Sequence, residues 1–172
     1  MTLFIFFLLL IILVLAGTAT YAGWRAAPWA PTFKRDTERF LKLAGIKPGQ
    51  KIYDLGCGDG RLVLAAGEAG AVAIGFEISL LPYLIAKWRI LRSPFKKKCS
   101  IKFRDFWRAD LSGADVVYFF LMPKIFTKIK NKLEKELKPG AKVIIYAWPM
   151  EGWTPLVENC PVSKTPIYVY QR

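Results

Sequence analysis

Residues 51–61 read KIYDLGCGDGR, and this stretch decides the fold. Apolar residues come first, as in a short buried strand. A turn with glycine at every second position follows, before an apolar helix begins near Arg61. Glycine allows a positive φ and lets a ligand approach the backbone closely. The first N–H groups of the next helix have no partner within that helix, so they would face the ligand. The stretch therefore predicts a nucleotide-binding turn between a strand and a helix.

The spacing of this turn favours one cofactor. Dinucleotide sites use G-x-G-x-x-G to seat a pyrophosphate, whereas this turn reads D-x-G-x-G-x-G from Asp54 and carries a second acid, Asp59. Two carboxylates would repel a diphosphate, and they suit a cationic amine or sulfonium beside a ribose. Glu77 ends a second apolar run at about the distance expected for a ribose-binding acid. We therefore predict S-adenosylmethionine as the cofactor.

With these features the chain resembles the class I S-adenosylmethionine-dependent methyltransferases. Strands alternate with helices from residue 33 onward, which predicts an α/β fold with a doubly wound, mostly parallel, Rossmann-like sheet. Ligands of such sheets bind at the carboxyl ends of the strands. Four candidates fall at such ends: Asp54, Glu77, Asp105 and the pair Met122-Pro123. The expected strands are residues 52–55, 71–77, 100–104, 116–121, 142–148 and 167–171, with a short one near 156–158; the expected helices are residues 33–44, 62–69, 80–91 and 124–137.

The composition indicates which kinds of partner the chain can bind. The 172 residues include 26 Lys and Arg against 13 Asp and Glu, a net charge of +13, and the first charged side chain is Arg25. An uncharged N-terminal segment thus precedes a strongly basic domain, which favours anionic partners such as lipid headgroups or nucleic acid. The three cysteines (Cys57, Cys99 and Cys160) have no paired spacing, and the chain has no histidine. We therefore expect no metal site and no disulfide framework.

The N-terminal segment predicts a membrane span. Residues 3–24 are uncharged and strongly apolar; as a helix they would cover about 33 Å, close to the ~30 Å of a hydrocarbon core. Gly17-Thr18-Ala19 resembles a signal cleavage site, but no basic residue precedes the apolar run, which favours a retained helix. The expected organisation is a transmembrane helix (residues 1–24), a linker (25–32) and a methyltransferase domain (33–172).

The flanking residues predict the orientation of this helix. Tyr21, Trp24 and Trp29 fit an aromatic belt at the membrane interface, and Arg25 and Arg35 follow. By the positive-inside rule we expect a single-pass membrane protein whose catalytic domain is cytoplasmic, where S-adenosylmethionine is available.

A second basic region follows the expected helix over residues 80–91. Lys87, Arg89 and Arg92 lead into the run Lys96-Lys97-Lys98. Two interpretations of this charge are equally good. It could belong to a solvated helix face, or it could form a patch that binds an anionic lipid surface or an acidic partner.

Several motifs resemble a narrower family. They are PWAPT ahead of the first helix of the domain, DLGCGDGR, GFEIS, FRDFW, the FLMP loop, and KLEKELKPGAKVIIYAWPMEGWTP from Lys132 to Pro155. Together with the leading hydrophobic segment, they resemble the membrane-anchored protein-lysine methyltransferases of mitochondria that act on the ATP synthase c-subunit and the adenine nucleotide translocase, with their prokaryotic relatives. The resemblance covers residues 28–155. It implies lysine methylation of a protein substrate close to the bilayer.

The resemblance also implies roles for individual residues. Glu77 would hold the ribose hydroxyls, with Ile78 against the adenine. The full cofactor-binding set is Asp54, Gly56, Cys57, Gly58, Gly60, Glu77, Ile78, Asp105 and Phe106. Two positions depart from the family pattern: Cys57 replaces a usual serine, and Ser79 replaces a usual asparagine.

A lysine substrate has to lose a proton before it can attack the methyl group. With an ordinary pKa of ~10.4, keeping the amine neutral at pH 7 costs about 4.6 kcal/mol. Asp59 is the carboxylate best positioned to accept this proton, although it could equally pair with Arg61. The backbone carbonyls beside Pro123 are the alternative. An aromatic channel would lower the pKa of the amine, and its expected lining is Leu121, Met122, Trp148 and Trp153.

Other functions stay open. The same anchor would also deliver a lipid headgroup or another small amine to the enzyme. Methylation of nucleic acid is permitted by the charge, but the fourth expected strand ends in FFLMP and lacks the Asn/Asp-Pro-Pro-Tyr/Phe loop of base-amine methylation, so we do not expect a nucleic-acid partner. A cofactor-binding protein without catalysis is the remaining alternative.

Overall fold

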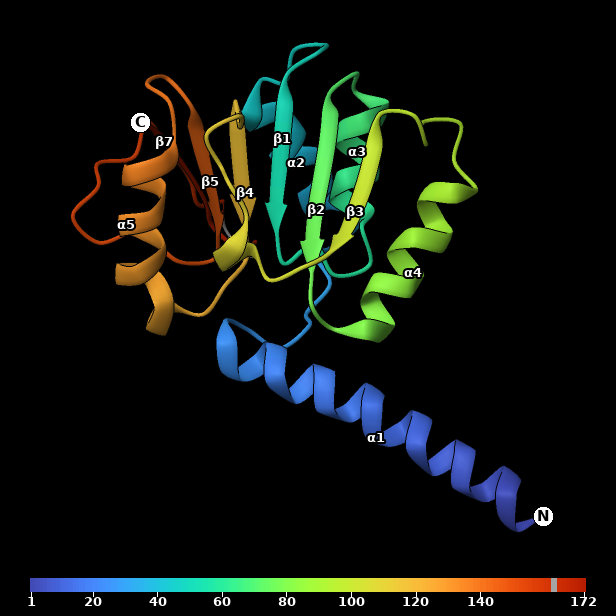
Figure 1. Cartoon of the computed structure of the whole chain (residues 1–172). Coiled ribbons are helices and arrows are strands. Elements are labelled where there is room, and N and C mark those ends of the chain that lie inside the picture. The colour runs from blue at the N-terminus through green and yellow to red at the C-terminus, as the bar shows by residue number, and fades with distance from the viewer. Residues whose placement is uncertain (162–163) are drawn as a thin grey trace.

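A seven-stranded sheet forms the centre of the protein (Figure 1). The structure is a computed structural model that describes residues 1–161 and 164–172. The strand order is β3-β2-β1-β4-β5-β7-β6. β1 to β5 run parallel to one another, and β7 runs antiparallel to both of its neighbours, β5 and β6. The strands are β1 (Lys51–Leu55), β2 (Val72–Glu77), β3 (Cys99–Phe103), β4 (Val116–Phe119), β5 (Lys142–Tyr146), β6 (Val157–Asn159) and β7 (Ile167–Gln171).

Helices cover both faces of this sheet, as the doubly wound prediction requires. One apolar core lies between the sheet and α5, and the other lies between the sheet and α2, α3 and α4. The helices are α1 (Thr2–Arg25), α2 (Lys34–Ala44), α3 (Arg61–Glu68), α4 (Leu80–Leu91) and α5 (Phe126–Glu136), with 3₁₀ turns η1 (Phe106–Arg108) and η2 (Pro123–Ile125). The strand order reverses at β1, which pairs with β2 on one side and β4 on the other. Such a switch point creates a crevice at the carboxyl ends of the strands.

The predicted α/β, Rossmann-like fold is confirmed, and two strands end earlier than expected. β4 ends at Phe119 instead of residue 121, because the chain turns there into the loop before η2. β5 ends at Tyr146 instead of residue 148, because Ala147 adopts a φ of 80°, which breaks the extended backbone. Both early ends place loop residues at the edge where ligands bind.

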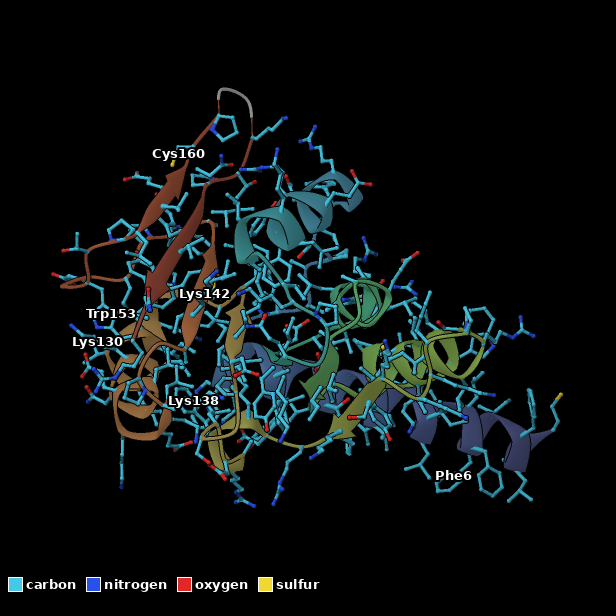
Figure 2. All side chains as sticks on the ribbon, turned by 90° about the horizontal axis from the view of Figure 1, so that it is seen from above. Phe6, Lys130, Lys138, Lys142, Trp153 and Cys160 are labelled. Carbon is cyan, nitrogen blue, oxygen red and sulfur yellow. The ribbon has the colours of Figure 1, made fainter. Side chains whose placement is uncertain are left out.

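The N-terminal helix projects from the domain. α1 is 24 residues long and apolar enough to cross a membrane, and its apolar side chains are exposed along most of its length. Phe6 stands on this free part, away from the sheet (Figure 2). Only its last turns touch the domain: Leu80 N donates to Thr18 Oγ1 (3.2 Å), and Arg25 pairs with Asp105 (2.7 Å). The arrowheads of β1, β2 and β3 point toward α1, so this helix meets the domain at the carboxyl edge of the sheet (Figure 1).

Candidate active site

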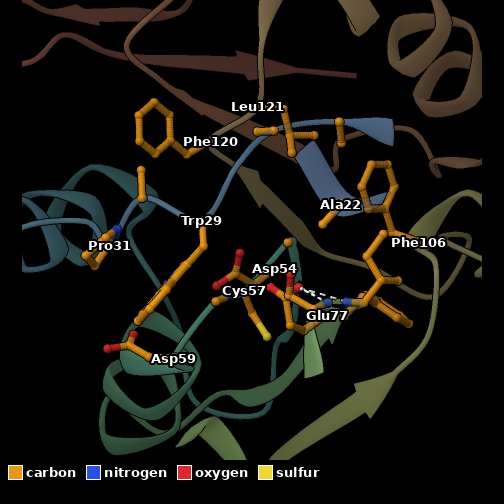
Figure 3. A pocket seen from close by; sticks show the side chains of 18 of the residues that line it. Ala22, Trp29, Pro31, Asp54, Cys57, Asp59, Glu77, Phe106, Phe120 and Leu121 are labelled. Carbon is orange, nitrogen blue, oxygen red and sulfur yellow. Dashed lines mark hydrogen bonds between the residues drawn. The ribbon is translucent and has the colours of Figure 1, made fainter. Parts of the chain in front are cut away.

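A cleft opens at the carboxyl ends of β1, β2 and β4 (Figure 3). About 750 Å³ of space, counted to its open mouth, lies between the glycine turn after β1 and residues 26–32. We call residues 26–32 the roof. The roof is held from below, because Arg61 Nη1 donates to Thr32 O (2.7 Å) and Met122 N donates to Ala26 O (3.3 Å). The expected linker is therefore part of the site and not a free spacer.

The turn after β1 can be built only with glycine. Gly56, Gly58 and Gly60 have φ values of 87°, 53° and 71°, a region that side chains disfavour. At Gly60 a Cβ would stand 2.9 Å from the Ala86 Cβ, so α4 packs directly against the turn. Phe76 O accepts hydrogen bonds from the N–H groups at 56 and 57 (3.0 and 2.9 Å), which ties the turn to β2. The missing side chains thus let Leu121, Trp29 and Ala86 pack closely against the turn, at Gly56, Gly58 and Gly60 respectively.

Glu77 organises the same turn. Its carboxylate accepts hydrogen bonds from Gly58 N (2.8 Å), Ile78 N (2.8 Å) and Ser79 N (2.7 Å). Burial raises the pKa of Glu77, and these three N–H groups partly offset that effect. A carboxylate has about four lone-pair sites, so one remains for a ribose hydroxyl at the cleft. Glu77 thus links the glycine turn to the segment that precedes α4.

Asp54 is a buried carboxyl in the cleft without a cationic partner among the described residues. Its side chain is buried, and burial, followed by the charges of Glu77 and Asp59, raises the pKa of Asp54 well above its ordinary 3.8. Among residues 1–161 and 164–172, no lysine or arginine forms an ion pair with it. A buried carboxylate in this state attracts a cation. The site therefore suits a ligand with an ammonium or sulfonium group.

The structure does not support Asp59 as the proton acceptor. Arg61 binds it with two nitrogens (3.0 and 2.6 Å), and Arg89 adds a third contact at 3.0 Å. Burial alone would raise the pKa of Asp59, but the bonds from Arg61 and the charge of Arg89 outweigh it and hold the pKa below its ordinary value. A carboxylate whose pKa is lowered by two cationic partners is a weak acceptor for the proton of a substrate amine. Asp59 instead joins the start of α3 to α4.

Ile78 and Phe106, both in the cofactor-binding set that the resemblance implies, line the cleft. Asp105 lies just outside this lining. It accepts from Arg25 Nη2 at 2.7 Å and from Trp107 N at 3.0 Å, so it caps η1 and holds the end of α1. Arg104 lines the cleft beside it and was not foreseen from the sequence.

Cys57 belongs to the packing under the turn. Its thiol is buried in the core on the α3 side of the sheet, 2.5 Å from where a Cβ on Gly75 would stand. Burial raises the pKa of this thiol well above its ordinary value, so it stays protonated. Gly75, on β2, is therefore also needed as glycine, because a side chain there would clash with Cys57.

An aromatic wall borders the cleft on the β4–β5 side. Phe120 lines the cleft and stacks on Trp148, with ring centroids 5.8 Å apart and planes 25° apart. Its other neighbour is Tyr146, edge to face at 4.8 Å. Leu121 also lines the cleft, 3.5 Å from where a Cβ on Gly56 would stand. Trp148 therefore adjoins the site through Phe120, a residue that the sequence did not single out as a site residue.

The loop after β4 reaches the surface. Met122 is 38% exposed, and Pro123 opens η2 in an exposed position. Neither residue lines the cleft, although Met122 follows the lining residue Leu121 and its N–H is bonded to the roof.

Trp153 is not a channel residue. Its Nε1 donates to Glu134 Oε1 (2.8 Å), and its ring packs against Tyr170 at 5.5 Å. Those partners belong to α5 and β7, and Figure 2 places Trp153 beside Lys130 on that side of the molecule, far from Phe6. The expectation was wrong because the tail after β5 turns outward over α5.

Trp29 lies over the glycine turn, whereas the sequence predicted it in an aromatic belt at the membrane interface. The indole extends from the roof over the glycine turn, with Nε1 2.7 Å from the position that a Cβ on Gly58 would take (Figure 3). Tyr118 is a further cleft residue that sequence reasoning missed; its hydroxyl lies 3.3 Å from Thr32 Oγ1. The only sequence signal for Trp29 is that PWAPT is among the motifs of the resemblance, and Tyr118 has no such signal.

Comparison with known proteins identifies the family. Residues 54–157 match the family model described as the ANTKMT methyltransferase domain. The chain belongs to this family. The match runs from Asp54, at the glycine turn, to the first residue of β6, so it includes most of the cleft.

Relatives of this ANTKMT-family chain agree with the assignment. A protein-lysine N-methyltransferase of Saccharolobus islandicus is 36% identical over 149 residues, which cover 83% of this chain and 92% of that protein. The ATP synthase c-subunit lysine N-methyltransferase of Rattus norvegicus is 32% identical; the match covers 74% of this chain and 59% of that protein. The chain therefore spans little more than half of the rat relative.

A solved structure supports the cofactor. The RNA methyltransferase from Salinibacter ruber, crystallised with S-adenosyl-L-homocysteine, superposes with a TM-score of 0.79 at 30% identity and covers 83% of this chain and 93% of its own. This ANTKMT-family chain is an S-adenosylmethionine-dependent methyltransferase. Its own residues fit the cofactor, because a cation in the cleft would neutralise the buried Asp54 and Glu77 lines the same cleft.

Proposed function

We propose that this chain is a membrane-anchored protein-lysine N-methyltransferase that acts on a membrane or membrane-associated protein. One observation carries the proposal: α1, a helix able to span a bilayer, continues directly into the roof of the cofactor cleft. A substrate lysine that reaches this cleft must then lie close to the bilayer. The relatives support lysine as the target, since the Saccharolobus and rat proteins are named for lysine methylation.

The proposed organisation follows from the same contact. Residues 1–24 form the transmembrane helix, residues 25–32 the linker that roofs the cleft, and residues 33–172 the catalytic domain. The basic domain next to the helix supports a cytoplasmic location with a single membrane pass, since net positive charge is retained on that side. Anionic lipid at that surface would attract the domain.

The cofactor supplies a methyl group on a cationic sulfur, and the chain holds the two reacting partners in line. Asp54 would bind the cationic methionine portion over Gly56, Gly58 and Gly60. Glu77 would accept from the ribose, and Ile78, Asp105 and Phe106 would border the adenine. Trp29 covers the turn at Gly58 and would reduce the access of water to the bound cofactor, which would strengthen the electrostatic attraction inside.

The chain must also help the lysine lose its proton. The wall of Phe120 and Trp148 desolvates the amine, and desolvation lowers the pKa of an ammonium group. Burial raises the pKa of Tyr118, so its hydroxyl stays protonated and serves as a hydrogen-bond partner and not as a base. The carbonyls of Leu121 and Met122, next to Pro123, would orient the neutral amine. No step of this account uses Asp59.

A labelling experiment tests the proposal. The purified full-length protein is incubated with cell membranes and S-adenosylmethionine that carries a radiolabelled methyl group. The proposal predicts label in a protein fraction, recovered as methyl-lysine after hydrolysis. Label that is extracted into organic solvent would instead establish the alternative, a lipid headgroup or other small amine. The matched control is the Asp54→Asn variant, which is expected to bind the cofactor poorly.

RNA is a second candidate substrate, favoured by one specific observation. The Salinibacter ruber structure, which is 30% identical, is titled an RNA methyltransferase, and the net charge of +13 would suit a polyanion. The same incubation separates the two, because label on RNA disappears after ribonuclease treatment and label on lysine does not.

A further inference from the structure

The outer face of α4 carries an apolar stripe that the domain leaves uncovered. We call Leu81, Leu84, Trp88 and Leu91 the α4 stripe; they are 46%, 51%, 58% and 63% exposed. At about 100° per residue, these four side chains fall within an arc of about 80°. The opposite face of α4, with Pro82, Ala86 and Ile90, is buried against the domain. The helix is therefore apolar on both sides, and only one side has a partner within the described chain.

The charged side chains of the segment that carries the stripe are all positive, although Arg89 is paired with Asp59 of the glycine turn. Residues 78–104 contain eight lysine and arginine side chains and no acid: Lys87, Arg89, Arg92, Lys96, Lys97, Lys98, Lys102 and Arg104. Lys87 and Arg92 flank the stripe on its two sides by helical position. The guanidinium of Arg92 lies 4.6 Å from the centre of the Trp88 ring. An exposed apolar stripe bordered by cations matches the polar–apolar boundary of an anionic membrane.

The stripe also continues the apolar surface of α1. Leu80 N donates to Thr18 Oγ1 at 3.2 Å, and Ser79 Oγ donates to Thr18 O at 3.5 Å, so the beginning of α4 is fastened to α1. The exposed apolar side chains of α1 lie mostly before this junction. In Figure 1, α1 leaves the domain on the side where α4 lies. A bilayer entered by α1 would thus meet α4 at the level of Thr18.

We propose that α4 is an interfacial helix whose stripe inserts at the boundary between headgroups and acyl chains of an anionic leaflet, while its cations bind the headgroups. This inference rests on the proposed anchoring by α1. Two attachment points, α1 and α4, fix the tilt of the domain, which a single flexible tether would not. The cleft then opens at a constant height above the bilayer and selects lysines close to the membrane surface.

Spin-label accessibility in the full-length protein tests this proposal. Cys57 and Cys99 are buried and Cys160 is exposed, so a Cys160→Ser background leaves no exposed native cysteine. A nitroxide is attached at Leu84→Cys on the stripe, at Leu8→Cys on α1, and at Glu68→Cys, an exposed site on α3. The protein is reconstituted in equimolar phosphatidylcholine and phosphatidylglycerol vesicles, and collisions with oxygen are compared with collisions with a water-soluble nickel chelate.

The expected result is a lipid-like environment at Leu84→Cys and Leu8→Cys and an aqueous one at Glu68→Cys. Phosphatidylcholine vesicles, or the combined change Lys96→Gln, Lys97→Gln and Lys98→Gln, should shift the stripe label toward water, by about fivefold in the insertion equilibrium per cation removed. An aqueous label at Leu84→Cys beside a lipid-exposed label at Leu8→Cys overturns this inference and leaves the anchor intact. A stripe label that is shielded only after membrane proteins are added also overturns it, because the stripe then binds protein. An aqueous label at Leu8→Cys refutes the anchor itself.

Discussion

Replacing Asp54 with asparagine should separate cofactor binding from folding. The substitution keeps the shape of the side chain and removes a buried charge that no described cation balances. Losing the charged partner of the cofactor cation costs about 2 to 3 kcal/mol, which is about 30- to 150-fold in Kd. The cofactor-free protein should become more stable, by about 1 to 3 kcal/mol, because the buried charge is no longer desolvated.

The sign of the pH dependence follows from the same carboxylate. Its pKa in the folded protein is raised above 3.8, so folding stability falls as pH rises from 3.8 through the raised pKa, and cofactor affinity increases over the same interval. The part of both slopes that Asp54 contributes should disappear in Asp54→Asn, while the contributions of Glu77 and Asp59 to the stability slope remain. Calorimetry with S-adenosylmethionine and thermal unfolding without it measure the two effects. Asp110→Asn, at an exposed acid, is the control. Unchanged affinity, or a less stable cofactor-free variant, would refute the reasoning.

Three further substitutions probe the rest of the site. Trp29→Ala removes the indole over Gly58 and should speed cofactor dissociation by about two- to tenfold; an unchanged dissociation rate in stopped-flow fluorescence would argue against a closing role. Trp148→Ala should lower kcat/KM for the protein substrate by about tenfold, with the cofactor Kd unchanged, whereas Trp153→Ala, outside the cleft, should leave kcat/KM as it is. Asp59→Asn should lower the free energy of unfolding by about 2 kcal/mol, an effect present above pH 3.8 and lost as pH falls through the lowered pKa. The shape of its pH–rate profile should not change; loss of one limb of that profile would restore Asp59 as the base.

Local patterns explain why the sequence predicted the cofactor turn. Its features lie within eleven residues: the strand of residues 51–55, the acid at the strand end and the alternate glycines. Each of these features constrains the backbone by itself. The order of strands and helices is equally local, because hydrophobic periodicity shows it directly. The fold and the cofactor could therefore be predicted before any long-range contact was known.

The roof could not be predicted, because it depends on contacts between distant parts of the chain. Trp29 packs over Gly58, and the backbone oxygen of Thr32 accepts a hydrogen bond from Arg61; the partners in each pair are about 30 residues apart in the sequence. Hydrophobic periodicity carries no information about such pairs. Trp153 was assigned to the channel for the same reason, because its contacts with Glu134 and Tyr170 cannot be predicted from periodicity. Asp59 shows a different limit: its pairing with Arg61 was one of two open alternatives in the sequence, and the added contact from Arg89, thirty residues later, decides between them.

The most direct test of the account is the methylation state of lysines in membrane proteins from cells with and without this enzyme. Mass spectrometry of digested membranes should find at least one lysine that carries methyl groups when the enzyme is present and is unmodified when it is absent. The account predicts that this lysine lies close to a membrane-spanning segment, and that Asp54→Asn fails to restore the modification. Identical lysine methylation in both cell lines, with loss of methyl groups from lipid or RNA instead, would contradict it.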